Sequence, residues 1–154
     1  MEITLLAVGK LRPAVREVAD DYIRRLGRYL RVREVEVKEA ARAPTVEAQR
    51  EEEGRRLGAK LAGGGVLVAL AREGTQLTSR DIATHVGRWQ LAARPVDLAI
   101  GGSSGLGREL LARASFRWSL GPITLPHELA RVVVLEQLYR ACTILSGEKY
   151  HKGG

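Results

Sequence analysis

Three short, almost wholly apolar runs constrain the fold of this chain more than any other feature of its sequence. They are Ile3–Val8, Val66–Ala71 and Val96–Ile100. Apolar runs this short are typical of strands that are buried on both faces of a sheet. Val32–Val37 alternates valine with charge, which predicts an edge strand, and Phe116–Leu120 predicts a weaker fifth strand. We expect Val66–Ala71 to be a central strand.

Helical patterns fill the gaps between these strands. Pro13 begins the first helix, whose apolar residues recur at every third or fourth position as far as Tyr29. Thr45 is predicted to cap the second helix. The helices after the first are predicted over residues 45–61, 78–91, 107–114 and 126–145. This alternation predicts an α/β fold, with a mainly parallel sheet and helices on both faces, in one domain spanning 1–154.

Glycines cluster where the strand Val96–Ile100 ends, at Gly101, Gly102, Gly105 and Gly107. Such a cluster lets backbone N–H groups come close to a ligand, although a tight strand-to-helix turn explains the spacing equally well. A dinucleotide-binding fold has G-x-G-x-x-G after its first strand, and a P-loop requires G-K-[ST]. The spacing here matches neither pattern, so both nucleotide-binding classes are disfavoured.

A second irregular segment, Leu120–Pro126, follows the last predicted strand. It is apolar and contains two prolines, which remove backbone donors and stiffen the loop. Such a loop suits a flat ring such as adenine, held by van der Waals contacts and backbone hydrogen bonds. Together the two loops predict a pocket for a small, flat, polar ligand. The three histidines lack metal-ligand spacing, and the single cysteine, Cys142, is predicted to be a buried, unreactive thiol.

Basic residues are in excess, with a net charge of +7 and a pI near 10.1. Residues 10–33 hold eight basic residues against three acidic ones. An excess of this kind suggests a polyanionic partner, most often nucleic acid, or else a solvated arginine-rich surface. We expect Arg24, Arg25, Arg28 and Arg31, assigned to the first helix, to contact phosphates. No apolar run approaches the ~20 residues of a membrane span, and the N-terminus lacks a cationic leader, so we expect a cytoplasmic protein.

Six motifs carry a family resemblance: Leu5-Leu-Ala-Val-Gly-Lys10, Ile100-Gly-Gly-Ser-Ser-Gly-Leu106, Thr124-Leu-Pro-His127, Arg131-Val-Val-Val, Glu136-Gln-Leu-Tyr-Arg-Ala141 and Tyr150-His151. With these the chain resembles the bacterial ribosomal RNA large-subunit pseudouridine N3-methyltransferases of the SPOUT class, the RlmH family. The resemblance implies a single SPOUT domain over 1–154 with a C-terminal trefoil knot, active as a homodimer. The wide apolar surface of the last predicted helix independently favours a symmetric dimer.

The resemblance also implies an activity: S-adenosylmethionine-dependent methylation of N3 of a pseudouridine in 23S ribosomal RNA, on assembled ribosomes. The implied cofactor-binding residues are Leu70, Gly101, Gly102, Leu120, Gly121, Pro122, Ile123, Thr124 and Leu125. The implied catalytic residues are His151, Tyr150 and Arg131, where the tail of one subunit lies near the cofactor of the other. We expect His151 to act as the base and Tyr150 to position the target base. The sulfonium is already activated, so no metal is required.

One residue departs from the family pattern. Members of the family have an acid directly after the position of Leu70, where this chain has Ala71. The loss of that acid supports an alternative function, a non-catalytic basic RNA-binding or ribosome-associated module.

Overall fold

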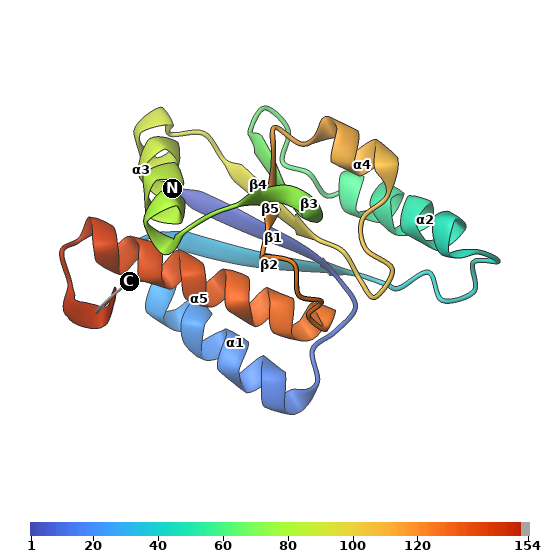
Figure 1. Ribbon diagram of the computed structural model, residues 1–154, viewed down its shortest axis with the longest axis horizontal. Coiled ribbons are helices and arrows are strands. Elements are labelled where there is room, and N and C mark those ends of the chain that lie inside the picture. Colours follow the sequence, from blue (N-terminus) through green and yellow to red (C-terminus); the bar gives the residue numbers. More distant parts are fainter. Residues whose placement is uncertain (152–154) are drawn as a thin grey trace.

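Strands and helices alternate along the whole chain, as predicted (Figure 1). The structure is a computed structural model that describes residues 1–151, apart from the side chain of His151. The strands are β1 (Glu2–Val8), β2 (Arg31–Val37), β3 (Val66–Gln76), β4 (Val96–Ile100) and β5 (Phe116–Ser119). The helices are α1 (Pro13–Leu26), α2 (Val46–Gly58), α3 (Ser79–Ala92), α4 (Arg108–Arg113) and α5 (His127–Leu145), followed by a short 3-10 helix, η1 (Lys149–His151).

The five strands form one sheet in the order β2-β1-β4-β3-β5, and all neighbouring strands are parallel. The prediction that Val32–Val37 is an edge strand is confirmed. The central strand is β4, with Leu98 in register with Leu5 of β1 and Val68 of β3. Because the strands are parallel, the loops that follow them all begin at the same edge of the sheet, where α/β folds bind ligands.

Helices cover both faces of this sheet, as predicted. On one face, Leu5 and Leu98 join a core with α1, α3 and α5 that includes Val134 and Leu138. On the other face, Leu6 and Val8 pack with residues of α2 and α4. Adjacent residues of β1 thus serve opposite cores, because successive strand side chains point to opposite faces. No helix of the described residues has the length and apolarity to cross a membrane.

Local signals set the helix starts where the sequence predicted them. Pro13 occupies the first turn of α1. The Thr45 hydroxyl accepts a hydrogen bond of 3.0 Å from the Ala48 N–H, which confirms the predicted cap. Thr78 and Asp81 form a reciprocal capping box at α3, and the Thr78 backbone N–H holds the pKa of Asp81 below its usual value.

The structure corrects three predicted boundaries. The third strand does not end at Ala71 but continues to Gln76, because Thr75 and Gln76 pair again with β5 after a register shift. The intervening Arg-Glu-Gly segment interrupts the apolar pattern and conceals this extension. The first helix ends at Leu26, not Tyr29, so Arg28 and Arg31 lie outside it. The second helix ends at Gly58 rather than near Leu61.

Leu98 tests the two-sided burial of β4. It is 0% exposed, whereas Leu91 of α3 is 89% exposed. We expect Leu98→Ala to lower the free energy of unfolding by about 3 kcal/mol, because it removes buried methyl groups and leaves a cavity. Leu91→Ala should change it by less than about 0.5 kcal/mol. Urea unfolding of both variants measures this, and equal effects would contradict the assignment of β4 to the core.

Candidate functional site

A cavity of about 780 Å³ opens at the carboxyl edge of the sheet, within the size range of small-molecule sites. Its walls come from residues 70–73 within β3, from the segments that follow β4 and β5, and from parts of α2, α4 and α5. Eight of the nine predicted cofactor-binding residues line it: Leu70, Gly101, Gly102, Leu120, Gly121, Ile123, Thr124 and Leu125. The remaining one, Pro122, lies in the same loop but does not line the cavity. The structure therefore brings the two predicted loops together around one space.

The glycine loop closes tightly on itself beside the cavity. The Gly105 N–H donates a hydrogen bond of 3.0 Å to the Gly102 carbonyl, and Gly105 has a left-handed φ of +80°. A Cβ atom on Gly101 would lie 2.5 Å from the carbonyl carbon of Gly105, so no side chain fits there. The same glycines thus form a tight turn and a wall of the cavity, and the two interpretations of their spacing are compatible.

Helix α2 supplies a wall that the sequence did not reveal. Glu47, Arg50 and Glu51 line the cavity. The Arg50 Nε donates a hydrogen bond to the Ser104 carbonyl, and Glu51 Oε1 accepts one of 3.2 Å from the Arg108 N–H. These contacts join residues more than 50 positions apart. The only signal in the sequence is that α2 is strongly polar, with few apolar residues to bury.

The lining combines apolar side chains with charges of both signs. Leu70, Ile100, Leu106 and Leu120 provide apolar surface, while Glu51 and Glu73 bring carboxylates. Arg50, Arg72 and Arg108 bring guanidinium groups. Ala71 also lines the cavity, and Glu73 places a carboxylate two residues further along β3. Such a site can hold a flat ring together with polar and charged groups.

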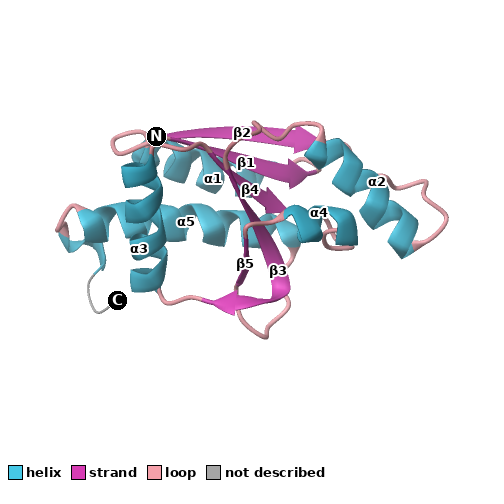
Figure 2. Ribbon diagram, turned by 90° about the horizontal axis from the view of Figure 1, so that it is seen from above, coloured by secondary structure: helices cyan, strands magenta, loops and turns pink. Residues whose placement is uncertain are grey.

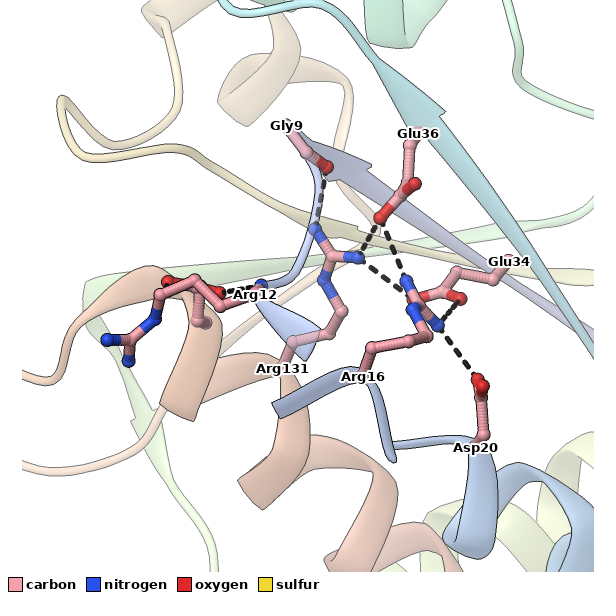
Figure 3. Close-up of polar contacts among 8 residues, drawn as sticks. Gly9, Arg12, Arg16, Asp20, Glu34, Glu36 and Arg131 are labelled. Carbon is pink, nitrogen blue, oxygen red and sulfur yellow. Dashed lines mark hydrogen bonds and ion pairs between the residues drawn. The ribbon is translucent and has the colours of Figure 1, made fainter. Parts of the chain in front are cut away.

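Arg131 lies in a buried ion-pair network outside this cavity (Figure 3). Its side chain is 1% exposed, and Nη1 donates to Glu34 at 2.9 Å and to Glu36 at 2.5 Å. Its Nη2 donates to the Gly9 carbonyl at 3.1 Å. Arg16 binds the same two carboxylates, and hydrogen bonding to Glu34 raises the pKa of Arg16. These contacts occupy Arg131 in holding the first turns of α5 against β2.

Tyr150 packs within its own chain at the far end of α5 from the cavity. Its ring packs edge-on against the ring of Tyr139, with 4.7 Å between the ring centroids. Its hydroxyl oxygen lies 3.4 Å from the hydroxyl oxygen of Tyr22. Burial is the main cause of a raised pKa of Tyr150. Figure 2 shows the last described residues beyond the far end of α5, whereas β1 and β2 point toward α2 and α4. The side chain of His151 lies outside the described residues. Within one chain, Tyr150 and the cavity are therefore not brought together.

The cysteine and the two other histidines lie outside the cavity. Cys142 is buried, as predicted, and desolvation raises the pKa of its thiol to about 11. His85 packs against Phe116 at 4.8 Å, and burial lowers the pKa of its imidazole. His127 is the first residue of α5 and follows Pro126, the N-cap residue, which makes no side-chain capping hydrogen bond. Among the described residues, no group of three His, Cys, Asp or Glu side chains is placed to hold a metal ion.

Comparison with protein families and with known proteins gives full-length matches. A family model described as "Predicted SPOUT methyltransferase" matches residues 1–151. A protein of Anaeromyxobacter dehalogenans named ribosomal RNA large subunit methyltransferase H is 48% identical over 153 residues, covering 99% of this chain and 100% of the relative. A Pseudomonas aeruginosa protein of the same name is 41% identical over 155 residues, with the same coverage.

Solved structures share the fold at lower identity. A probable methylase family protein from Haemophilus influenzae superposes with a TM-score of 0.58 at 13% identity, over 96% of this chain and 69% of the other. A probable methyltransferase from Bordetella pertussis gives a TM-score of 0.56 at 18% identity, over 91% of this chain and 95% of the other. At these identities the likeness supports a common fold and no more.

Arg131→Met tests the buried network. Its loss leaves Glu34 and Glu36 without their buried partner, so we expect the free energy of unfolding to fall by about 3 kcal/mol. The matched Arg24→Met removes an ion pair with Asp21 in which Arg24 is 78% exposed, and should cost less than about 1 kcal/mol. Urea unfolding at low and high salt compares the two. If Arg131→Met is as stable as Arg24→Met, the network does not hold α5.

Proposed function

This chain belongs to the SPOUT methyltransferase family, and from that premise we propose that it methylates N3 of a pseudouridine in large-subunit ribosomal RNA. Methylation of large-subunit ribosomal RNA is supported by the names of relatives that match over the full length. The observation that carries the proposal is one cavity walled by residues 70–73 of β3 and by the segments after β4 and β5. We place the reaction on assembled ribosomes in the cytoplasm.

SPOUT methyltransferases use S-adenosylmethionine, and the lining of the cavity suits its chemistry. Leu70, Leu120 and Leu125 offer apolar surface for the adenine ring. The tight turn at Gly101 exposes backbone groups without side-chain obstruction, which suits hydrogen bonding to ring nitrogens. Glu51 and Glu73 offer carboxylates for hydroxyl or ammonium groups. When bound, this cofactor supplies a methyl group already activated on a sulfonium.

The protein's own contribution is orientation and proton removal. N3 of pseudouridine is an imide nitrogen and a poor nucleophile until its proton leaves. We assign the removal of that proton to His151, acting directly or through a water molecule. We assign the positioning of the target base to Tyr150. Arg131 then acts as a positioning residue, since its guanidinium contacts Glu34, Glu36 and Gly9.

Two features of the assembly belong to the same proposal. The first is a homodimer, supported by exposed apolar residues on α1 and α5, namely Val18, Leu129 and Leu145. Tyr150 does not line the cavity of its own chain. A second subunit would bring its tail to this cavity. The second is a C-terminal trefoil knot formed by the three chain segments that line the cavity, and this part of the proposal rests on family membership. Sedimentation equilibrium tests the dimer, and a monomer at micromolar concentration would remove the route for tail participation.

The alternative of a non-catalytic RNA-binding module rests on Ala71. Glu73 weakens this support, because it supplies a carboxylate to the same cavity. Titration with S-adenosylmethionine by calorimetry separates the two functions. We expect binding well below millimolar concentration, and loss of one methylpseudouridine from the large-subunit RNA of a strain lacking this protein, read by mass spectrometry. No binding at millimolar cofactor favours the module.

Gly101→Ala tests the cavity. Its Cβ would meet the Gly105 backbone at 2.5 Å, so the glycine loop must shift. We expect the Kd for S-adenosylmethionine to rise at least about tenfold, equivalent to ~1.4 kcal/mol. Gly87→Ala on α3 is the control, since its Cβ would make an ordinary 3.5 Å contact with Leu145. Calorimetry should show wild-type affinity for this control, and unchanged affinity in Gly101→Ala would argue against the site.

His151→Ala tests the tail. If His151 removes the proton, kcat at saturating cofactor should fall by roughly 10²–10⁴-fold while the cofactor Kd stays unchanged. Tyr150→Phe keeps the ring and loses one hydroxyl, so its kcat should fall by only about fivefold. Methyl incorporation into ribosomes measures both. Wild-type kcat in the two variants would show that the tail has no catalytic role.

A further inference from the structure

Ion pairing neutralises most of the basic segment 10–33. Six of its seven arginines lie within 4.0 Å of a carboxylate. The pairs are Arg12–Glu128, Arg16–Glu34, Arg24–Asp21, Arg25–Asp21, Arg28–Glu148 and Arg31–Glu2. A cation already paired with a carboxylate has part of its charge offset and offers fewer free donors to a phosphate. Ion pairing therefore leaves this segment less unpaired positive charge than its sequence suggests.

Three other arginines gather at the cavity from elements far apart in the sequence. Arg50 comes from α2, Arg72 from β3 and Arg108 from the start of α4. All three are exposed. In the part of the chain that the structure describes, no carboxylate lies within 4.0 Å of their guanidinium nitrogens. Arg50 donates its Nε to the Ser104 carbonyl, which leaves both of its terminal nitrogens available.

The acidic residues that line the same cavity form no ion pairs with these three arginines among the described residues. Glu47, Glu51 and Glu73 also line it. Glu51 is half-buried and accepts a hydrogen bond from the backbone N–H of Arg108, so one of its oxygens is engaged by the main chain. Guanidinium groups that share a cavity with carboxylates and yet form no ion pair with them are placed for an external anion.

We propose that Arg50, Arg72 and Arg108 bind the phosphates of the RNA strand that presents the target base, and that segment 10–33 is not the main RNA contact. This inference rests on the proposed function. An enzyme that acts on a base must take it out of the stack and into its pocket. The phosphates on either side of that nucleotide then lie beside the pocket. The arginine fork matches phosphate oxygens in a bidentate geometry, which makes these three groups suitable partners.

Arg72→Gln and Arg108→Gln, singly and together, test the proposal. Neither guanidinium has a hydrogen-bond partner among the described residues, so these changes remove charge and leave the cavity walls in place. The matched controls are Arg24→Gln and Arg31→Gln, which are 78% and 77% exposed but ion-paired. The probe is a fluorescently labelled fragment of large-subunit ribosomal RNA, titrated at several salt concentrations. Thermal unfolding verifies that each variant folds.

We expect the double variant to bind RNA at least tenfold more weakly. Each single change should lower the slope of log affinity against log salt by about one. The controls should stay within twofold of the wild type in RNA affinity. In the double variant, the loss of RNA affinity should exceed any change in the Kd for S-adenosylmethionine.

Three outcomes overturn the inference. The first is wild-type RNA affinity in the double variant, and the second is an equal loss in the controls. The third is weaker cofactor binding with unchanged RNA binding, which would assign the arginines to the cofactor's carboxylate. Failure of the proposed function is read separately. A wild-type protein that neither binds S-adenosylmethionine nor methylates ribosomes refutes that function, while the RNA titration still decides the role of the arginines.

Discussion

The arrangement of the site depends on the buried ion pairs of Arg131 with Glu34 and Glu36. Burying a charge is costly unless partners replace water, and Glu34, Glu36 and the Gly9 carbonyl do so here. The anchor lies in the second turn of α5, directly after the loop that lines the cavity. A second tie runs from the Arg12 N–H to the Glu128 carboxylate at 2.6 Å. Together they fix where the loop 120–126 rejoins the fold.

The parallel sheet then determines where the cavity can form. Since every strand runs the same way, residues 70–73 of β3 and the segments after β4 and β5 meet at one edge, although they lie far apart in sequence. Helix α2 reaches the same edge from the other face and holds the glycine loop through Ser104. The arginines likewise fall into two groups according to where the fold places them. Arginines near α1 are neutralised by carboxylates, whereas those at the cavity keep their guanidinium groups available.

Helix α5 separates two chemically different regions. Ala130, near its start, lines the cavity, and the tyrosine cluster lies at its end, where Tyr139 contacts Tyr22, Tyr29 and Tyr150. Arg25 and Arg140 lie over rings of this cluster, which stabilises the chain end against its own subunit. A role of Tyr150 in the reaction therefore requires the cavity of a second subunit, which the proposed homodimer would provide.

The sequence by itself determined the element order, the capped helix starts, the edge position of β2 and the two loops of the cavity, because each depends on local periodicity or on the conformational limits of glycine and proline. Tertiary structure alone decided the extension of β3, the contribution of α2 and the surroundings of Arg131. Arg131 meets Glu34 across 97 residues, and no local pattern records such a partner. The same holds for charge: residue types revealed how many arginines the chain has, but only packing decided which of them remain free of carboxylates.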